Sequence, residues 1–253
     1  MSAAGPLRVL IVDDEAPARS RLRDLLADCA PVVPTEVVGE AGNGREALDL
    51  LAAGEADLVL LDIRMPEMDG IELARHLLTL PRAPAVVFTT AYDAYAIRAF
   101  ELRAVDYLLK PIRAARLQEA LERARNARPP AAEVLRQLAP APRVHLSSLE
   151  RGRVQLIPVR DIVYLKAELK YVTARTRDRE YLVDESLTRL EEEFGPRFAR
   201  VHRNCLVARD HVTGFERVAE EGGEGRWVVL LDGVAERLPV SRRQQHVVKD
   251  LAG

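Results

Sequence analysis

Five short apolar runs alternate with segments of helical periodicity over residues 1–126, and this alternation limits the fold more than any other feature of the chain. The first run, Leu7 to Asp13, is almost continuously apolar, which is typical of a strand buried on both faces of a sheet. The four later runs are Glu36 to Glu40, Leu58 to Asp62, Ala85 to Thr90 and Tyr107 to Lys110. This pattern predicts an α/β fold with a doubly wound, five-stranded parallel sheet.

Helices are expected between these strands, because apolar residues recur there at helical spacing. The expected ranges are Pro17 to Cys29, Arg45 to Ala53, Ile71 to Leu80, Tyr95 to Leu102 and about Arg113 to Asn126. Gly54 and Pro81 follow two of these ranges and act as helix stop signals. We interpret residues 1–126 as one domain.

The chain changes character after residue 126. Residues 127–142 contain four prolines, at positions 129, 130, 140 and 142, which indicates a linker. From residue 143 onward short strands dominate, and helices are expected only over Ser186 to Phe194, with Ser186 as its N-cap, and Ser241 to Leu251. Residues 143–253 are therefore expected to form a second, mainly β domain.

Composition narrows the class of protein. The chain has only two cysteines, Cys29 and Cys205, which are far apart in sequence and cannot form a disulfide framework. Its apolar runs are shorter than the ~20 residues that a membrane helix needs, and its N-terminus lacks a signal sequence. We expect a cytoplasmic protein without a membrane partner.

The net charge of −2 is an average over unlike parts. Residues 1–126 hold 15 basic and 20 acidic side chains, whereas residues 143–253 hold 20 basic and 18 acidic side chains. The second domain is thus weakly basic, which by itself is more typical of a neutral surface than of a nucleic-acid-binding one.

Sites in doubly wound sheets lie beyond the carboxyl ends of the strands. Here those ends carry Asp13, Asp14, Asp62, Thr90 and Lys110. Three neighbouring carboxylates repel one another unless a cation lies among them, and Mg²⁺ suits such oxygen ligands. The pattern predicts a phosphoryl-transfer site in which Asp62 is the nucleophile and Lys110 stabilises charge. The hydroxyl of Thr90 would donate a hydrogen bond.

Residues 6–126 resemble the receiver domain of two-component response regulators. The resemblance is carried by Val12-Asp13-Asp14-Glu15, Asp62-Ile63-Arg64-Met65-Pro66-Glu67-Met68-Asp69-Gly70, Thr90-Ala91 and Asp106-Tyr107-Leu108-Leu109-Lys110-Pro111. It implies a flavodoxin-like fold and phosphorylation of Asp62 by a sensor histidine kinase.

The same resemblance assigns roles to further residues. It implies that Asp13, Asp14 and Asp62 hold Mg²⁺ together with the backbone carbonyl of Arg64. Thr90 and Tyr107 match the switch pair of the family, in which the hydroxyl moves toward the phosphoryl group and the aromatic ring then turns inward. The basic side chain of Arg64 is a departure that could slow or speed loss of the phosphoryl group.

A phosphatase that forms an aspartyl phosphate shares this nucleophile and this metal. Such enzymes need an acid two residues after the nucleophile, where this chain has Arg64, which cannot protonate a leaving group. We therefore expect no enzyme activity beyond self-dephosphorylation. Turnover of a generic phosphate ester that depends on Asp62 would favour the phosphatase.

The second domain lacks a recognisable catalytic set but has basic clusters, at Lys170-Tyr171, Arg197 to Arg203 and Ser241-Arg242-Arg243-Gln244-Gln245. These clusters contain amide and hydroxyl groups that could read base edges. A module that binds another protein instead of DNA is the main alternative, and salt-dependent DNA binding distinguishes the two.

Nearly all of residues 143–250 resemble the LytTR DNA-binding domain. The resemblance is carried by Asp161-Ile162-Val163-Tyr164-Leu165-Lys166-Ala167, Lys170-Tyr171-Val172, Ser186-Leu187-Thr188-Arg189-Leu190, Phe198-Ala199-Arg200-Val201-His202-Arg203-Asn204 and Leu238-Pro239-Val240-Ser241-Arg242-Arg243. It implies DNA contacts from loops that enter successive major grooves. The implied contact residues are Lys170, Arg203, Asn204, Arg242 and Arg243.

Some of these residues also have purely structural interpretations. We expect His202 to be a hydrogen-bonded framework residue and Cys205 to be a small buried apolar residue. Lys166 stands where the family commonly has Glu, so the resemblance gives weaker support for DNA contacts from that strand. Arg242 and Arg243 fall in the first turn of an expected helix, where positive charge opposes the helix dipole and an anionic partner would offset it.

Together these features predict a DNA-binding response regulator of the LytR/AlgR kind. Its expected partners are a sensor histidine kinase and double-stranded DNA with paired direct-repeat sites. We expect phosphorylation at Asp62 to favour a homodimer, which would raise DNA affinity through effective concentration.

Overall fold

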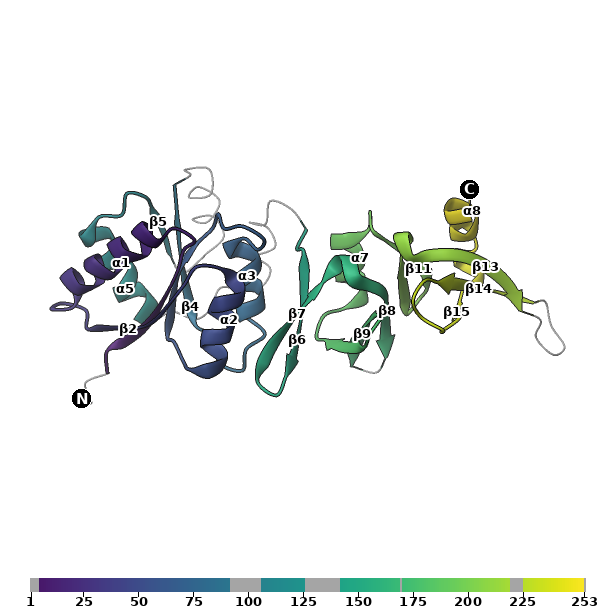
Figure 1. The fold of residues 1–253 in the computed structure, drawn as a ribbon, viewed down its shortest axis with the longest axis horizontal. Helices are drawn as coiled ribbons and strands as arrows, with labels where there is room; N and C mark the ends of the chain where they lie inside the picture. The colour runs from purple at the N-terminus through teal and green to yellow at the C-terminus, as the bar shows by residue number, and fades with distance from the viewer. Residues whose placement is uncertain (1–4, 92–105, 126–141, 169, 219–224, 253) are drawn as a thin grey trace. The chain divides into compact units, whose positions relative to one another are not determined.

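The computed structural model describes residues 5–91, 106–125, 142–168, 170–218 and 225–252 (Figure 1). The chain divides into two compact units, one of Met1–Arg143 with Leu149–Val154 and the other of Val144–Ser148 with Gln155–Gly253. Within the described residues, no helix is long and apolar enough to cross a membrane.

The first unit contains a five-stranded parallel sheet in the order β2-β1-β3-β4-β5. Its strands are β1 (Leu7–Val12), β2 (Thr35–Ala41), β3 (Leu58–Asp62), β4 (Ala85–Thr90) and β5 (Asp106–Leu109). Every residue of β3 and β4 is buried, which explains their continuous apolar sequences. The predicted doubly wound α/β fold is confirmed.

Helices cover both faces of this sheet. They are α1 (Ala16–Cys29), α2 (Gly44–Ala53), α3 (Gly70–Leu77) and α5 (Ala114–Arg125). Figure 1 shows α1 and α5 on one face and α2 and α3 on the other. On the first face, Leu26 of α1 and Leu117 of α5 pack with Ile11 and Leu60 of the sheet into one core. This packing holds the strand ends in fixed positions.

The helix ends match the sequence-based ranges closely. The main difference is α3, which was expected to reach Leu80 and ends at Leu77. Asp69 caps its start by accepting a hydrogen bond from the backbone N–H of Glu72 at 2.7 Å. The helix expected over Tyr95 to Leu102 and most of the expected linker lie outside the described residues.

From residue 144 onward the chain is mainly β, as predicted. It forms a five-stranded sheet in the order β10-β9-β8-β12-β11, a three-stranded sheet β13-β14-β15 and the strand pair β6-β7. The strands are β6 (His145–Glu150), β7 (Arg153–Pro158), β8 (Ile162–Glu168), β9 (Tyr171–Thr176), β10 (Glu180–Val183), β11 (Phe198–His202), β12 (Cys205–Ala208), β13 (Val212–Val218), β14 (Arg226–Leu231) and β15 (Leu238–Pro239).

The helices of this β-rich region are short. They are α7 (Leu187–Phe194) and α8 (His246–Ala252), with 3₁₀ turns η1 (Val159–Asp161), η2 (Arg209–His211) and η3 (Arg242–Gln244). Ser186 caps α7 as predicted, since its side chain accepts a hydrogen bond from the backbone N–H of Arg189 at 3.3 Å. Leu190 packs into one apolar core and Val247 of α8 into a second.

The C-terminal helix is shorter than expected. The expected range began at Ser241, but the structure has the turn η3 there, and α8 begins only at His246. The side chain of Ser241 makes no capping hydrogen bond. Because Arg242 and Arg243 lie in a three-residue turn and not in the first turn of a helix, the helix-dipole argument for an anion at this position does not hold.

Gly70 allows α3 to approach the end of β3 closely. A Cβ atom at this position would lie 2.0 Å from the carbonyl oxygen of Asp62 and 3.0 Å from the Cα of Ile63. The backbone N–H of Gly70 also donates to the carbonyl of Ile63 at 2.9 Å. Only glycine fits without moving the backbone that carries Asp62.

We therefore expect Gly70→Ala to destabilise the first unit by about 1–3 kcal/mol, as overpacking of a close contact does. Gly54→Ala is the matched control, because the nearest atom to a Cβ there is 3.9 Å away. Thermal unfolding of both variants checks this. Equal melting temperatures for the two variants would contradict the steric argument.

Candidate functional site

Four predicted site residues end or directly follow strands of the parallel sheet, all at the carboxyl ends of the strands, called the sheet edge below. Asp13 follows β1, Asp62 ends β3, Thr90 ends β4 and Lys110 follows β5. The parallel register aligns these strand ends with one another. The strand ends therefore lie side by side where sites of this fold class form, and side-chain contacts join Asp13, Asp62 and Lys110 there.

Lys110 bridges two carboxylates at this edge. Its Nζ donates to Oδ2 of Asp13 and to Oδ1 of Asp62, each at 2.7 Å. Asp13 is 0% exposed and Asp62 is 4% exposed, so neither charge is well solvated. One ammonium faces two buried carboxylates, and the cluster is left with an excess of negative charge.

Both oxygens of the Asp62 carboxylate accept hydrogen bonds. Oδ1 faces Lys110, and Oδ2 accepts from the backbone N–H of Arg64 at 2.7 Å. Burial nevertheless raises the pKa of Asp62 above its usual value, because the donation from Lys110 offsets burial only in part and the charge of Asp13 adds to it. The carboxylate is thus held in place but incompletely neutralised.

Lys110 remains charged in this setting. Burial opposes its ammonium form, but the hydrogen bonds to Asp13 and Asp62 outweigh burial and raise the pKa of Lys110. Its backbone N–H donates to the carbonyl of Thr90 at 2.7 Å, which fixes the strand ends relative to each other. The peptide bond to Pro111 is cis.

The other predicted residues of this site are placed differently. Thr90 is buried and Tyr107 is half-buried. Asp14 is exposed, and its carboxylate makes no hydrogen bond or ion pair with a described residue. Arg64 contacts Asp62 through its backbone N–H, so a metal contact through its carbonyl stays a prediction.

The structure itself does not gather a set of three metal ligands. Among the residues it describes, no group of three or more His, Cys, Asp or Glu side chains is arranged around one point. The donors that do lie together are Asp13 and Asp62, with Lys110 between them. The charge of this pair still fits a divalent cation, which commonly binds one or two carboxylates and several waters.

Sequence reasoning missed one residue that supports this site. Arg19, in the first turns of α1, donates from Nη1 to the carbonyl of Asp13 at 2.7 Å, and its Nε lies 3.5 Å from a carboxylate oxygen of Glu40 in β2. Arg19 thereby holds the loop between β1 and α1. In the sequence, the one sign of this role is the position of Arg19, shortly after the first strand and the acidic residues that follow it.

A second missed group joins β5 to α5. The buried carboxylate of Asp106 accepts from Nη1 of Arg116 at 3.0 Å and from Nη1 of Arg123 at 2.9 Å. Arg116 also donates to the carbonyl of Tyr107 at 3.3 Å. Because Tyr107 lies on β5 and Lys110 directly follows that strand, these contacts connect the site to the surface helix α5.

In the β-rich region, the predicted DNA-contact residues lie in loops that backbone hydrogen bonds bring together. The N–H of Ala167, near the end of β8, donates to the carbonyl of Asn204 at 2.8 Å. The N–H of Ser241, just before η3, donates to the carbonyl of Val201 at 2.8 Å. The turn between β11 and β12 therefore lies beside both the β8–β9 turn and η3.

Four of the five predicted contact residues are exposed cations: Lys170, Arg203, Arg242 and Arg243. None of these four side chains makes an ion pair with a residue that the structure describes. Exposed guanidinium and ammonium groups without carboxylate partners are available to phosphates or base edges.

Asn204 differs from these cations. Its Oδ1 lies 2.5 Å from Nδ1 of His202, and its Nδ2 donates to the carbonyl of Ala167 at 3.4 Å. Its amide thus shapes the turn, and His202 is the hydrogen-bonded framework residue that the sequence predicted. The second N–H of its amide and the second lone pair of its Oδ1 are left for a base edge.

Two further sequence interpretations can be compared with the structure. Cys205 is buried, as expected, and burial raises the pKa of its thiol to about 12, which keeps it protonated. Lys166 forms an ion pair with Glu168 of the same strand. Its charge is therefore balanced locally, unlike that of Lys170.

Two family models match the chain. Residues 9–122 match the response regulator receiver domain, and residues 152–253 match the LytTr DNA-binding domain. Each match covers one of the two regions described above.

Relatives match over almost the whole length of the chain. The chain is 41% identical to the positive alginate biosynthesis regulatory protein of Pseudomonas aeruginosa, over 97% of this chain and 98% of that protein. It is 38% identical to an uncharacterized response regulatory protein of Vibrio cholerae, over 95% and 96%. It is 31% identical to the sensory transduction protein LytT of Bacillus subtilis, over 97% and 98%.

These full-length matches agree with the geometry of the sheet edge and of the β-rich loops. The chain belongs to the family of two-component DNA-binding response regulators that join a receiver domain to a LytTR domain.

Proposed function

We propose that Asp62 is the residue that accepts a phosphoryl group from the sensor histidine kinase of this system. The observation that carries the proposal is the bridge of Lys110 between Asp62 and Asp13. A carboxylate oxygen of Asp62 would attack the phosphorus while the bond to the donor nitrogen of the kinase histidine breaks. Self-dephosphorylation by water would return the free carboxylate.

Three other groups would assist this transfer. The ammonium of Lys110 would neutralise charge on the phosphoryl oxygens, and the backbone N–H of Arg64 already points at Oδ2 of Asp62. The hydroxyl of Thr90, at the end of the neighbouring strand β4, would donate to the phosphoryl group.

We further propose that Asp13, Asp62 and the exposed Asp14 hold Mg²⁺ together with the carbonyl of Arg64. The excess negative charge around Lys110 supports this, as does the all-oxygen donor set. The ion would supply positive charge against the incoming phosphoryl oxygens.

Phosphorylation would be transmitted through β5. When Thr90 turns toward the phosphoryl group, the ring of Tyr107 would move inward, and the Arg116 contact to the Tyr107 carbonyl would carry that change to α5. We propose that this promotes a homodimer that binds paired direct-repeat DNA sites. Two weakly basic domains on one dimer gain affinity through effective concentration.

The domain limits that fit this function are residues 1–126 for the receiver, 127–142 for the linker and 143–253 for the LytTR domain. The family matches at 9–122 and 152–253 support this division. The DNA contacts would come from Lys170, Arg203, Asn204, Arg242 and Arg243.

The phosphorylation site is tested by labelling the full chain with a small phosphoryl donor. We expect Asp62→Asn to abolish labelling, since the amide is not a nucleophile, and omission of Mg²⁺ to suppress labelling of the wild type. Asp24→Asn, an exposed carboxylate on α1, is the matched control and should label normally. Undiminished labelling of Asp62→Asn would sink the assignment.

The raised pKa of Asp62 also predicts how stability varies with pH. A carboxyl group whose pKa is higher in the folded state favours folding only while it is protonated, and this contribution is lost as pH rises through the folded pKa. Without divalent cations, Asp62→Asn should therefore melt at a higher temperature than the wild type at neutral pH.

The difference in melting temperature between Asp62→Asn and the wild type should shrink as the pH falls below about 4, the ordinary pKa range of an aspartate. Thermal unfolding across this range measures it. If Asp62→Asn instead melts below the wild type at neutral pH, the contact between Asp62 and Lys110 stabilises the fold by more than burial of the Asp62 carboxylate destabilises it.

The DNA interface is tested by selecting bound fragments from genomic DNA and measuring their affinity for variants of the full chain. Arg243→Ala should cost about 1–3 kcal/mol if the side chain contacts a base. Lys249→Ala, an exposed cation on α8, is the control. If both variants lose the same amount of DNA affinity, Arg243 contributes only its positive charge and no specific base contact.

A further inference from the structure

The basic cluster from Arg197 to Arg203 contains three arginines, and the structure gives each of them a different setting. Arg203 is exposed in the turn between β11 and β12 and makes no ion pair with a residue that the structure describes. Arg197 pairs with Asp210 at 3.0 Å, and Arg200 pairs with Glu191 at 2.6 Å. The proposed DNA contacts use Arg203 and leave Arg197 and Arg200 without a role.

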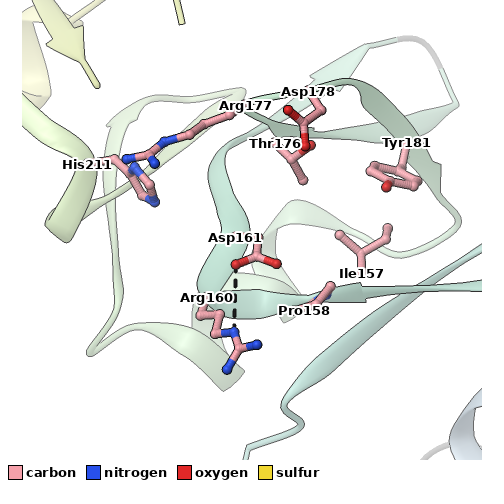
Figure 2. A pocket seen from close by; sticks show the side chains of 9 residues that line it. All are labelled: Ile157, Pro158, Arg160, Asp161, Thr176, Arg177, Asp178, Tyr181 and His211. Carbon is pink, nitrogen blue, oxygen red and sulfur yellow. Dashed lines mark ion pairs between the residues drawn. The ribbon is translucent and has the colours of Figure 1, made fainter. Parts of the chain in front are cut away.

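Arg197 serves the other end of strand β11. It precedes this strand, whereas the turn with Arg203 follows it. Its guanidinium donates to the carbonyl of Arg160 at 2.7 Å. Arg160 lies 3.7 Å from Asp161 in a pocket of about 390 Å³, whose arginines stand among carboxylates (Figure 2). Positive charge at that end is offset within the protein, so Arg197 gives no reason to expect DNA there.

Arg200 is placed differently, because its guanidinium reaches the turn itself. Nε and Nη2 of Arg200 lie 2.7 Å and 2.6 Å from Oε2 of Glu191. Nη1 donates to the backbone carbonyl of Arg203 at 2.7 Å. All three nitrogens are thus engaged within the protein, and the side chain is only 17% exposed. Because a guanidinium is planar and rigid, the carboxylate that holds one side of it also directs the other side.

Helix α7 carries Glu191 and is itself anchored on the core. Leu190 and Phe194 of α7 pack in one apolar cluster with Phe198 of β11. The rings of Phe194 and Phe198 meet edge to face, with their centroids 6.4 Å apart. The carboxylate of Glu191 therefore approaches Arg200 from a helix that packing holds in place.

The turn that receives this contact is of a kind that needs support. His202 pairs with Cys205, which leaves a two-residue turn of Arg203 and Asn204, and the register of β11 shifts between Arg200 and His202. Two-residue turns of hairpins usually have a positive φ at one or both residues, because this backbone twist matches that of the strands. Neither Arg203 nor Asn204 has a positive φ. The turn therefore lacks the backbone geometry that hairpins prefer.

Other contacts hold the second residue of the turn. Oδ1 of Asn204 lies 2.5 Å from Nδ1 of His202, and the carbonyl of Asn204 accepts from the N–H of Ala167 at 2.8 Å. The contact from Arg200 holds the first residue, Arg203, through its carbonyl. This carbonyl adjoins the Cα that carries the exposed Arg203 side chain.

We propose that Arg200 is a positioning residue of the DNA interface, directed by Glu191 and acting on the turn of Arg203 and Asn204. The proposal rests on the DNA-binding function and adds to it a pair of residues that does not touch DNA. A turn that is fixed before binding loses less conformational freedom when it meets the base edges. Base contacts specify a sequence, whereas phosphate contacts only position the protein. The pair should therefore matter more for a preferred sequence than for an arbitrary one.

The effect of removing the Glu191 charge separates positioning from plain electrostatics. Because DNA is an anion, loss of a carboxylate close to the interface leaves affinity unchanged or raises it if charge alone matters. Positioning predicts the reverse for Glu191→Gln, since Arg200 then loses the partner that directs it. Glu192→Gln is the matched control, because it removes the same charge from the next residue of α7, whose side chain is exposed.

The experiment measures binding of the full chain to a fragment selected from genomic DNA and to a duplex of arbitrary sequence. We expect Glu191→Gln and Arg200→Gln each to weaken binding of the selected fragment about threefold to tenfold, and the double variant to be no weaker than either. Glu192→Gln should keep the full preference for the selected fragment. Each variant is measured well below its melting temperature, so that loss of folded protein does not contribute.

Two further readouts should not change. Binding of Glu191→Gln to the arbitrary duplex should stay at the wild-type level or rise. The slope of log K against log salt should remain that of the wild type for all these variants, because none of them loses a phosphate contact.

Three results would overturn the proposal and leave the DNA-binding function intact. If Glu191→Gln binds the selected fragment as Glu192→Gln does, the pair does not act on the turn. If Arg200→Gln lowers the salt slope by about 0.9 while Glu191→Gln does not weaken binding, Arg200 contacts a phosphate itself. If Glu191→Gln loses equal affinity for both duplexes, its role is to stabilise the domain as a whole.

Failure of the DNA-binding function itself gives a different result. In that case the wild type binds no duplex at any salt concentration, and the positioning role of Arg200 is overturned together with that function.

Discussion

The shared hydrogen bonding of one lysine to two buried carboxylates is the constraint on which the receiver site depends. Lys110 cannot neutralise both Asp13 and Asp62, so the site retains negative charge in a place with little water. The arrangement persists because the core fixes the strand ends and Gly70 lets α3 pack against the backbone of Asp62. A site held by packing in this way keeps an excess of negative charge, and such a charge attracts a cation.

The β-rich region has the same property with the opposite sign. The four exposed cations predicted to contact DNA are Lys170, Arg203, Arg242 and Arg243. Backbone hydrogen bonds join the turns that carry them, and their side chains make no ion pair with a described residue. By contrast, Lys166 and Arg177 are each balanced by a neighbouring acid. A formal charge of −2 over the whole chain therefore conceals two sites of uncompensated charge, one acidic and one basic.

How well the sequence predicted the structure depended on burial. The receiver strands were predictable because strands buried on both faces have continuous apolar sequences, and β3 and β4 begin and end at the expected residues. Strand β13 is exposed or half-buried throughout and its sequence mixes charged and apolar residues, so it lacks the continuous apolar sequence of β3 and β4. Arg19 was missed for a related reason, since its ion-pair partner Glu40 lies on β2 and only the fold brings the two residues together.

Strand β5 explains how one short element can serve both chemistry and signalling. Its four residues end next to Lys110, carry Tyr107 and begin with Asp106, whose carboxylate binds two arginines of α5. All four residues of β5 pair with β4, which restricts how far one end of the strand can shift. In the mechanism proposed above, a phosphoryl group on Asp62 changes the contacts of Lys110, and β5 carries this change to Tyr107 and to the ion pairs between Asp106 and α5. Those ion pairs are the proposed point at which the change reaches the surface helix.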